Sequence, residues 1–139
     1  MNRRMALEWL KAAKDDLMVI EEISKNELLT HMMAFHSQQA LEKIFKAMIE
    51  YRMERVPKQH DLLLLQKKVG ADLPIEGEDI LEALNGLYIE SRYPGALGLL
   101  PGGKPTRAEA LEFYTFVKKV FGQACGVLKI TSKELSENL

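Results

Sequence analysis

The chain has 139 residues, 47% hydrophobic and 28% charged, a composition typical of one globular domain and too apolar for a disordered chain. Nineteen basic and twenty acidic side chains leave a formal charge of −1, which excludes an extended basic binder of nucleic acid but not a local basic patch. The single cysteine, Cys125, excludes an internal disulfide and a thiolate metal site built by one chain. The longest apolar run covers residues 62–65 and the N-terminal segment turns polar early, so we expect a soluble cytoplasmic protein without a membrane span or secretory signal.

Helical spacing of apolar residues predicts two long helices in the first half of the chain. The first covers about residues 3–25 and the second about residues 27–54. Pro57 ends the second helix, because proline lacks the N–H and disfavours helix at the preceding residue. The apolar stripes are Leu10, Ala13, Leu17 and Ile20 in the first helix, and Leu41, Ile44, Met48 and Tyr51 in the second.

Two further helices and a long loop follow. A short helix is expected over about residues 61–69, ending at Gly70, and another over about residues 78–92, because Tyr93 precedes a proline. Three prolines and four glycines lie within residues 94–105 and predict a flexible connection.

The last long helix begins at a predicted capping box, in which the Thr106 hydroxyl accepts from the Glu109 amide and the glutamate reaches back. Its apolar positions are Ala110, Phe113, Val117, Val120, Ala124 and Val127. The fold class predicted is all-α: an up-and-down bundle of four main helices plus one short helix over residues 1–130. A polar C-terminal tail over residues 131–139 is expected to fray.

Three apparent motifs do not predict chemistry. Residues 98–104 match the G-x-x-x-x-G-K phosphate loop, but Pro105 takes the place of the serine or threonine and no strand precedes the loop. His31 and His36 point about 140° apart on a helix and cannot chelate one ion together. Cys125 is interpreted as a small buried hydrophobe. No metal site and no cofactor are predicted.

A polar row in the middle of the second helix has two interpretations. Gln38 and Glu42, Gln39 and Lys43, and Glu42 and Lys46 are each four residues apart, so they share one face. That face is either solvated, or it lines a groove or crosses an interface with satisfied hydrogen bonds.

Two helix termini carry candidate polar groups. His60 stands at the start of the third helix, where it either caps a backbone amide or moves a proton. Arg92, followed by Tyr93, ends the fourth helix, where it either complements the helix dipole or holds a phosphate in a bidentate contact.

Four segments taken together resemble a known family. They are Trp9, Ala13, Asp16 and Leu17; the run Phe35-His36-x-Gln38-Gln39-Ala40-x-Glu42-Lys43-x-x-Lys46; the segment Pro57-Lys58-x-His60-Asp61-Leu62-x-x-Leu65; and Arg92-Tyr93-Pro94. In this order, over about residues 3–128, they resemble the HEPN (higher eukaryotes and prokaryotes nucleotide-binding) domain family. The resemblance implies a homodimeric helical bundle with a nucleotide-binding role, commonly encoded beside a small nucleotidyltransferase and in some cases paired with it as toxin and antitoxin.

Two function hypotheses follow, besides a bundle with an unrelated partner role. The first is a non-catalytic module that binds a nucleotide or a nucleotidyltransferase partner; it predicts that Gln39, Glu42, Lys46, His60, Arg92 and Tyr93 converge in space. The second is a metal-independent ribonuclease, since other branches of the family use a closely spaced arginine and histidine from both subunits. In this chain that pair would be Arg55, which stabilises the phosphorane, and His60, which moves the proton.

Overall fold

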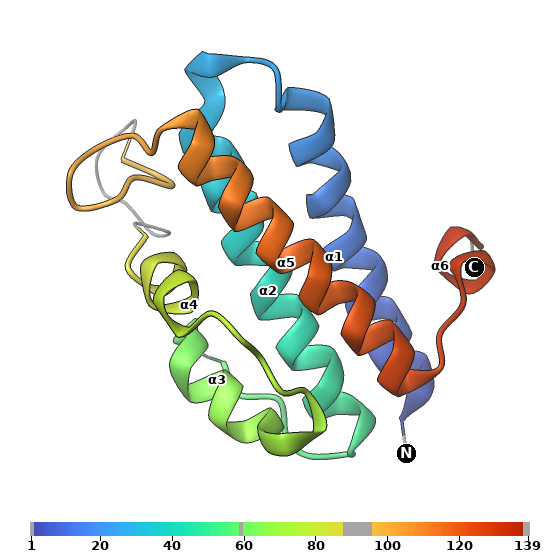
Figure 1. Cartoon of the computed structure of the whole chain (residues 1–139). Helices are drawn as coiled ribbons and strands as arrows, with labels where there is room; N and C mark the ends of the chain where they lie inside the picture. The colour runs from blue at the N-terminus through green and yellow to red at the C-terminus, as the bar shows by residue number, and fades with distance from the viewer. Residues whose placement is uncertain (1, 59, 88–95, 138–139) are drawn as a thin grey trace.

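Three long helices form the body of the computed structural model, which describes residues 2–58, 60–87 and 96–137. They are α1 (Arg3–Ile23), α2 (Thr30–Tyr51) and α5 (Arg107–Leu128). In Figure 1, α2 runs antiparallel beside α1 and α5 runs parallel to α2. No strand occurs within these ranges, so the predicted all-α bundle is confirmed.

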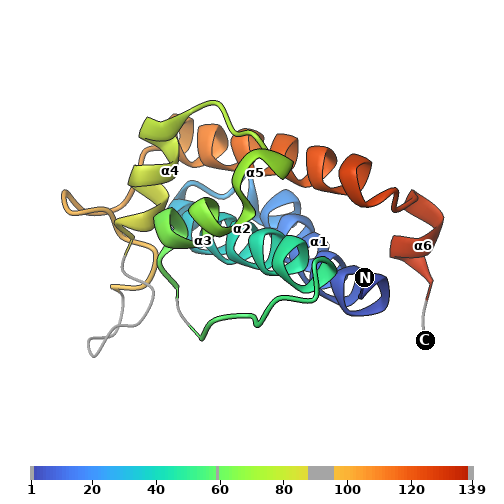
Figure 2. The same cartoon turned by 90° about the horizontal axis from the view of Figure 1, so that it is seen from below.

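The central helix is α2, which packs against α1, α5 and the shorter α3 (Leu62–Val69) and α4 (Glu78–Asn85). Its apolar side forms the middle of the core, where the side chains of Met33, Leu41, Ile44, Phe45 and Ile49 are fully buried. Seen from below, α5 covers one side of α2, while the described part of the connection between α2 and α3 (residues 52–58 and 60–61) lies on the opposite side (Figure 2). The two sides of α2 therefore face different surroundings.

The return from the bottom of the bundle to the top is made by α3 and α4, with the short 3-10 helix η2 (Gly70–Asp72) between them. A second 3-10 helix, η1 (Glu27–Leu29), lies at the turn between α1 and α2. The helix predicted over residues 78–92 is shorter than expected, since α4 ends at Asn85. The Asn85 side chain accepts the Leu62 backbone N–H at 2.8 Å, and Gly86 follows, a residue costly in a helix. Residues 88–92 lie outside the described residues.

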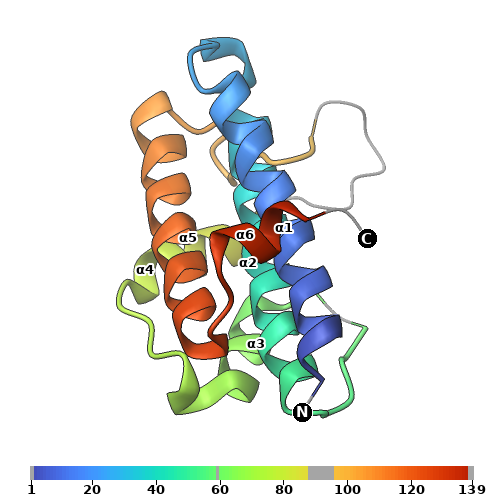
Figure 3. The same cartoon turned by 90° about the vertical axis from the view of Figure 1, so that its right-hand side faces the viewer.

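Fraying at the C-terminus was predicted wrongly, because α6 (Ser132–Ser136) forms there and lies against α1 (Figure 3). Thr131 and Glu134 make a second capping box. Arg3 donates to both Glu134 carboxylate oxygens, at 2.6 and 2.8 Å, and to the Lys129 carbonyl at 2.7 Å. Val127 was also assigned to the inner face wrongly: it is exposed, and Leu128 is buried in its place.

The loop before α5 lies partly against α2 in its described part, and its flexibility stays a prediction. Gly98 is buried against α2, and Lys104 Nζ donates to the Leu28 carbonyl at 3.1 Å. The capping box that begins α5 is confirmed: Glu109 N–H donates to Thr106 Oγ1 at 3.1 Å, and Thr106 N–H to Glu109 Oε1 at 2.9 Å. Within the part of the chain that the structure describes, no helix is long and apolar enough to cross a membrane.

Candidate functional site

Polar side chains gather on the side of α2 that faces away from α5, next to α1 and the connection before α3. We call this surface the polar face. It comprises Asp16, His36, Gln38, Gln39, Glu42, Lys43, Lys46 and His60. Six of these lie on α2 within eleven residues, and the 3.6-residue period turns them to one side of the helix while the apolar residues between them enter the core.

Four of these side chains are buried although they are polar or charged. Gln38 is fully buried, and Asp16, Glu42 and Lys46 are each at most 7% exposed. Charges removed from water are costly unless they are paired and hydrogen-bonded. The interpretation of the row as a simply solvated face is therefore excluded for these positions, and their partners define the site.

Glu42 is the centre of one cluster. Its Oε1 lies 2.6 Å from His60 Nδ1, and its Oε2 accepts from Lys46 Nζ at 3.2 Å. The next residue, Asp61, caps α3, since its Oδ1 accepts the N–H of Leu63 at 3.0 Å. The cap is thus Asp61, and His60 lies against the carboxylate of α2 instead.

Asp16 is the centre of a second cluster, which also joins a carboxylate, an imidazole and an ammonium group. His36 Nδ1 lies 2.7 Å from Asp16 Oδ1, and Lys43 Nζ donates to Oδ2 at 2.7 Å. The Phe35 ring packs against the His36 imidazole in a T-shaped arrangement, with centroids 5.1 Å apart. Each carboxylate thus holds one imidazole and one ammonium in place by charge-assisted hydrogen bonds.

Trp9 connects the two helices at the lower end of the polar face. The Lys46 ammonium lies 5.6 Å from the centroid of the Trp9 ring, within the range of a cation–π contact. The indole N–H donates to Glu50 Oε2 at 3.4 Å, and Asn2 donates to Oε1 of the same carboxylate at 3.3 Å. Trp9 is the only tryptophan of the chain, so its fluorescence reports on this part of the face.

Gln38 has an unmet hydrogen-bonding group. Its Oε1 accepts from Gln39 Nε2 at 2.7 Å, but its own Nε2 is buried and has no hydrogen-bond partner among the described residues. An unsatisfied buried donor costs about 1–3 kcal/mol. This donor stands four residues before Glu42, one helical turn away on the same side of α2.

The structure brings together part of the predicted site. Glu42, Lys46 and His60 are in contact, and Gln39 adjoins them through Gln38. Arg55 is exposed on the connection between α2 and α3. The two remaining members of the predicted set, Arg92 and Tyr93, lie outside the described residues.

Sequence reasoning missed the second cluster as a site. Asp16 and Lys43 are 27 residues apart, on different helices, so no spacing within one helix joins them. The signal present was an aspartate on the apolar side of the first helix: Asp16 follows Ala13 by three residues and adjoins Leu17, and both are buried. A charged residue at such a position calls for a partner from a neighbouring helix.

Other candidate groups lie apart from the polar face. Burial, and then the charge of Lys104, lower the pKa of His31. Cys125 is half-buried, and desolvation raises the pKa of its thiol, which disfavours a nucleophilic thiolate. Among the residues with described placement, no group of three or more His, Cys, Asp or Glu side chains could hold a metal ion.

Comparison with known proteins identifies the family. Residues 6–127 match the HEPN domain. No curated protein and no solved structure matches the chain. The match covers most of the chain, from the start of α1 nearly to the end of α5, and includes every residue of the polar face. The protein therefore belongs to the HEPN domain family.

Proposed function

We propose that this protein is a non-catalytic HEPN module of the cytoplasm that acts as a homodimer and binds a nucleotide through the polar face. The observation that carries the proposal is the pair of clusters on one surface, each with a carboxylate that orients an imidazole and an ammonium. Such groups, held before the ligand arrives, bind an anion without the cost of ordering long side chains.

The lysines have the donors that a phosphate requires. An ammonium has three N–H donors, and Asp16 accepts one from Lys43 while Glu42 accepts one from Lys46. The buried amide of Gln38 supplies a further unsatisfied N–H beside them. A ligand with both charged oxygens and a neutral acceptor, such as a nucleotide, matches this set of donors better than inorganic phosphate does.

The experiment is a titration of the purified protein with a panel of nucleotides, followed by melting temperature and by Trp9 fluorescence. A bound nucleotide is expected to raise the melting temperature by mass action and to change the emission of Trp9, which contacts Lys46. Lys46→Met should abolish both changes. Lys67→Met, at an exposed position of α3, is the matched control and should retain them.

If no nucleotide alters the melting temperature or the fluorescence of the wild-type protein, the binding proposal is wrong. The homodimer has a separate test, since sedimentation should give twice the mass of one chain.

The proposed partner is a small nucleotidyltransferase, as in a toxin–antitoxin pair. Such a protein encoded beside this chain is expected to co-elute with it, and separate elution contradicts the partnership.

A ribonuclease is the second candidate, favoured by one feature of His60. Its side chain is 51% exposed, and its Nδ1 is held 2.6 Å from a carboxylate that is itself buried, an arrangement that orients an imidazole for proton transfer. Arg55, five residues earlier, would stabilise the phosphorane across the dimer interface. Under this alternative RNA is cut without added metal, and His60→Ala reduces cleavage by orders of magnitude while the melting temperature is kept. Under the first proposal cleavage stays at background.

A further inference from the structure

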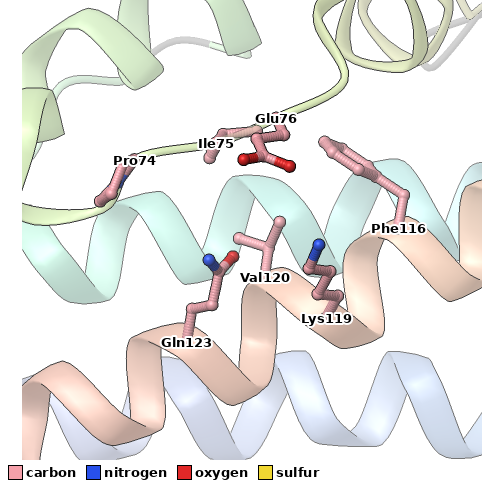
Figure 4. A pocket seen from close by; sticks show the side chains of 7 residues that line it. All are labelled: Pro74, Ile75, Glu76, Phe116, Lys119, Val120 and Gln123. Carbon is pink, nitrogen blue, oxygen red and sulfur yellow. The ribbon is translucent and has the colours of Figure 1, made fainter.

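A shallow groove, which we call the α4–α5 groove, is lined by α5 and by the chain that leads into α4. These two segments lie on the other side of α2 from the connection between α2 and α3 (Figure 2). The groove consists of three adjoining hollows that share lining residues, the largest of about 550 Å³. Its apolar floor is formed by Ile75, Ile80, Leu111, Phe116 and Val120. Figure 4 shows one end, where Pro74, Ile75 and Glu76 face Phe116, Lys119, Val120 and Gln123 of α5.

The chain that leads into α4 forms the wall opposite α5, and its distance from α5 is set at Gly77. Gly77 has φ +109°, and a Cβ added there would lie 3.3 Å from Cε2 of Phe116. The chain therefore passes directly over the phenylalanine ring, which only glycine permits at this backbone conformation. On the far side, α4 is anchored by the buried Leu81 and Leu84. The groove is thus formed before any partner arrives.

The rim of the groove is acidic. Glu76, Asp79, Glu109 and Glu112 line it, and Lys119 is the one cation among the lining residues. All four carboxylates belong to exposed residues. Within the described part of the chain, Glu76, Asp79 and Glu112 make no ion pair, so their charge is open to a partner.

We propose that the α4–α5 groove docks a basic amphipathic helix of a partner protein. Apolar side chains on one face of that helix would enter the hollows, and lysines or arginines on its flanks would meet the four carboxylates. The lining residues of α5 run from position 108 to position 123, about 22 Å of helix. A partner helix of about four turns has the matching length.

Charge argues against the other classes of occupant. Nucleic acid and anionic membrane surfaces carry the same sign as the rim and would be repelled. A second copy that used the same patch would place carboxylates against carboxylates, because a two-fold interface pairs a surface with itself. The inference is independent of nucleotide binding, since the polar face contributes no residue to the groove.

The experiment uses two synthetic helical peptides with the same leucine stripe at i, i+3, i+4 and i+7, one with lysine flanks and one with glutamate flanks. Fluorescence anisotropy of labelled peptide measures binding to the full chain. The lysine peptide is expected to bind about tenfold more tightly than the glutamate peptide, with the preference reduced by salt. In the double variant Glu76→Lys with Glu112→Lys, the preference should reverse.

The matched control is Asp15→Lys with Glu22→Lys, which changes the net charge equally at exposed positions of α1 and should keep the original preference. Loss of preference in both double variants would mean a general charge effect and overturns the proposal. So does absence of lysine-peptide binding to the wild-type chain. A change of oligomeric state in the groove variant alone would assign the groove to a second copy instead. Both double variants should bind nucleotide as the wild-type chain does, because neither changes a residue of the polar face. The groove proposal and the nucleotide proposal can therefore fail independently.

Discussion

Among the glycines that the structure describes, Gly98 leaves the least room for a side chain. It has φ +76°, and a Cβ added there would lie 1.9 Å from the carbonyl oxygen of His31 on α2. Any side chain therefore clashes with backbone and also meets strain in the left-handed region. The glycine allows the loop before α5 to lie directly on α2.

Gly98→Ala is accordingly expected to lower the free energy of unfolding by about 2 kcal/mol or more. Urea denaturation measures it. Gly102→Ala is the matched control in the same loop, since nothing lies within 4 Å of its added Cβ, and a change within about 0.5 kcal/mol is expected. Equal effects of the two substitutions would contradict the close approach of Gly98 to α2.

Asp16 and Asp15 are adjacent in sequence but differ in environment. Asp16 is 7% exposed and accepts hydrogen bonds from His36 and Lys43, whereas Asp15 is exposed. Asp16→Ala should destabilise the protein by about 1–3 kcal/mol, because it leaves a half-buried ammonium without its carboxylate. Asp15→Ala should change stability by less than about 0.5 kcal/mol. Chemical denaturation of both variants measures the free energy of unfolding. A similar loss of stability in the two variants would contradict the pairing of Asp16 with His36 and Lys43.

Among the elements, α6 is held to α1 by the contact of Arg3 with Glu134, by the Lys11 ammonium, which donates to the Glu137 carbonyl at 2.8 Å, and by the packing of Leu135 on the core. The side-chain hydrogen bonds from Arg3, and then the backbone N–H of Thr131, hold the pKa of Glu134 at about 2, below its ordinary 4.5. A group whose pKa is lowered in the folded state contributes stability above its ordinary pKa and loses it as pH falls through the folded value. The contact between α6 and α1 should therefore persist throughout the neutral and mildly acidic range.

Hydrogen exchange of the α6 amides tests this expectation. Exchange protection in wild-type protein should be the same at about pH 7 and about pH 5 after correction for the intrinsic rate. Arg3→Ala should lower the protection at both values, because it removes one of the anchors of α6, while Arg4→Ala, which changes an exposed neighbour, should leave it intact. Unchanged protection in the Arg3 variant would show that the contacts of Lys11 and Leu135 hold α6 without Arg3.

The other elements show where local patterns are sufficient. The long helices α1, α2 and α5 were predicted because an apolar stripe every three or four residues reports burial of one face. The end of α4 at Asn85 was not predicted, because it depends on a hydrogen bond from the backbone N–H of Leu62 to the Asn85 side chain, 23 residues away. α6 has a local signal in its capping box of Thr131 and Glu134, but its contact with Arg3 is 131 residues distant and could not be predicted from spacing.

At the scale of the whole molecule, one core centred on α2 unites the helices. Phe45 is fully buried in it, so Phe45→Ala should lower the free energy of unfolding by about 3–5 kcal/mol, a large share of the about 5–15 kcal/mol usual for a domain. Trp9 fluorescence and far-ultraviolet circular dichroism should lose their folded signals in one coincident transition. Phe121→Ala, at a half-buried position of α5, should cost less. Separate transitions would contradict a single cooperative core.

The candidate site depends both on residue spacing within one helix and on packing between distant segments. Glu42 and Lys46 were predicted to share a face because their spacing is four residues, which the helical period alone turns to one side. The contacts of Glu42 with His60 and of Asp16 with Lys43 join different segments, and only packing of those segments can bring them together. The acidic rim of the α4–α5 groove likewise combines residues from the α3–α4 connection, α4 and α5.

The order of residues was enough to establish the helical class, the main helices and the capping box at Thr106, because each of these depends on periods and contacts within a few residues. It also carried the resemblance to the HEPN family, through residue types in a fixed order along the chain. Folding in three dimensions decided which carboxylate holds which histidine and lysine, where α4 stops, and that the C-terminal residues pack on α1. The physical reason is one of range: hydrogen bonds and burial between distant segments exist only after the core around α2 has formed.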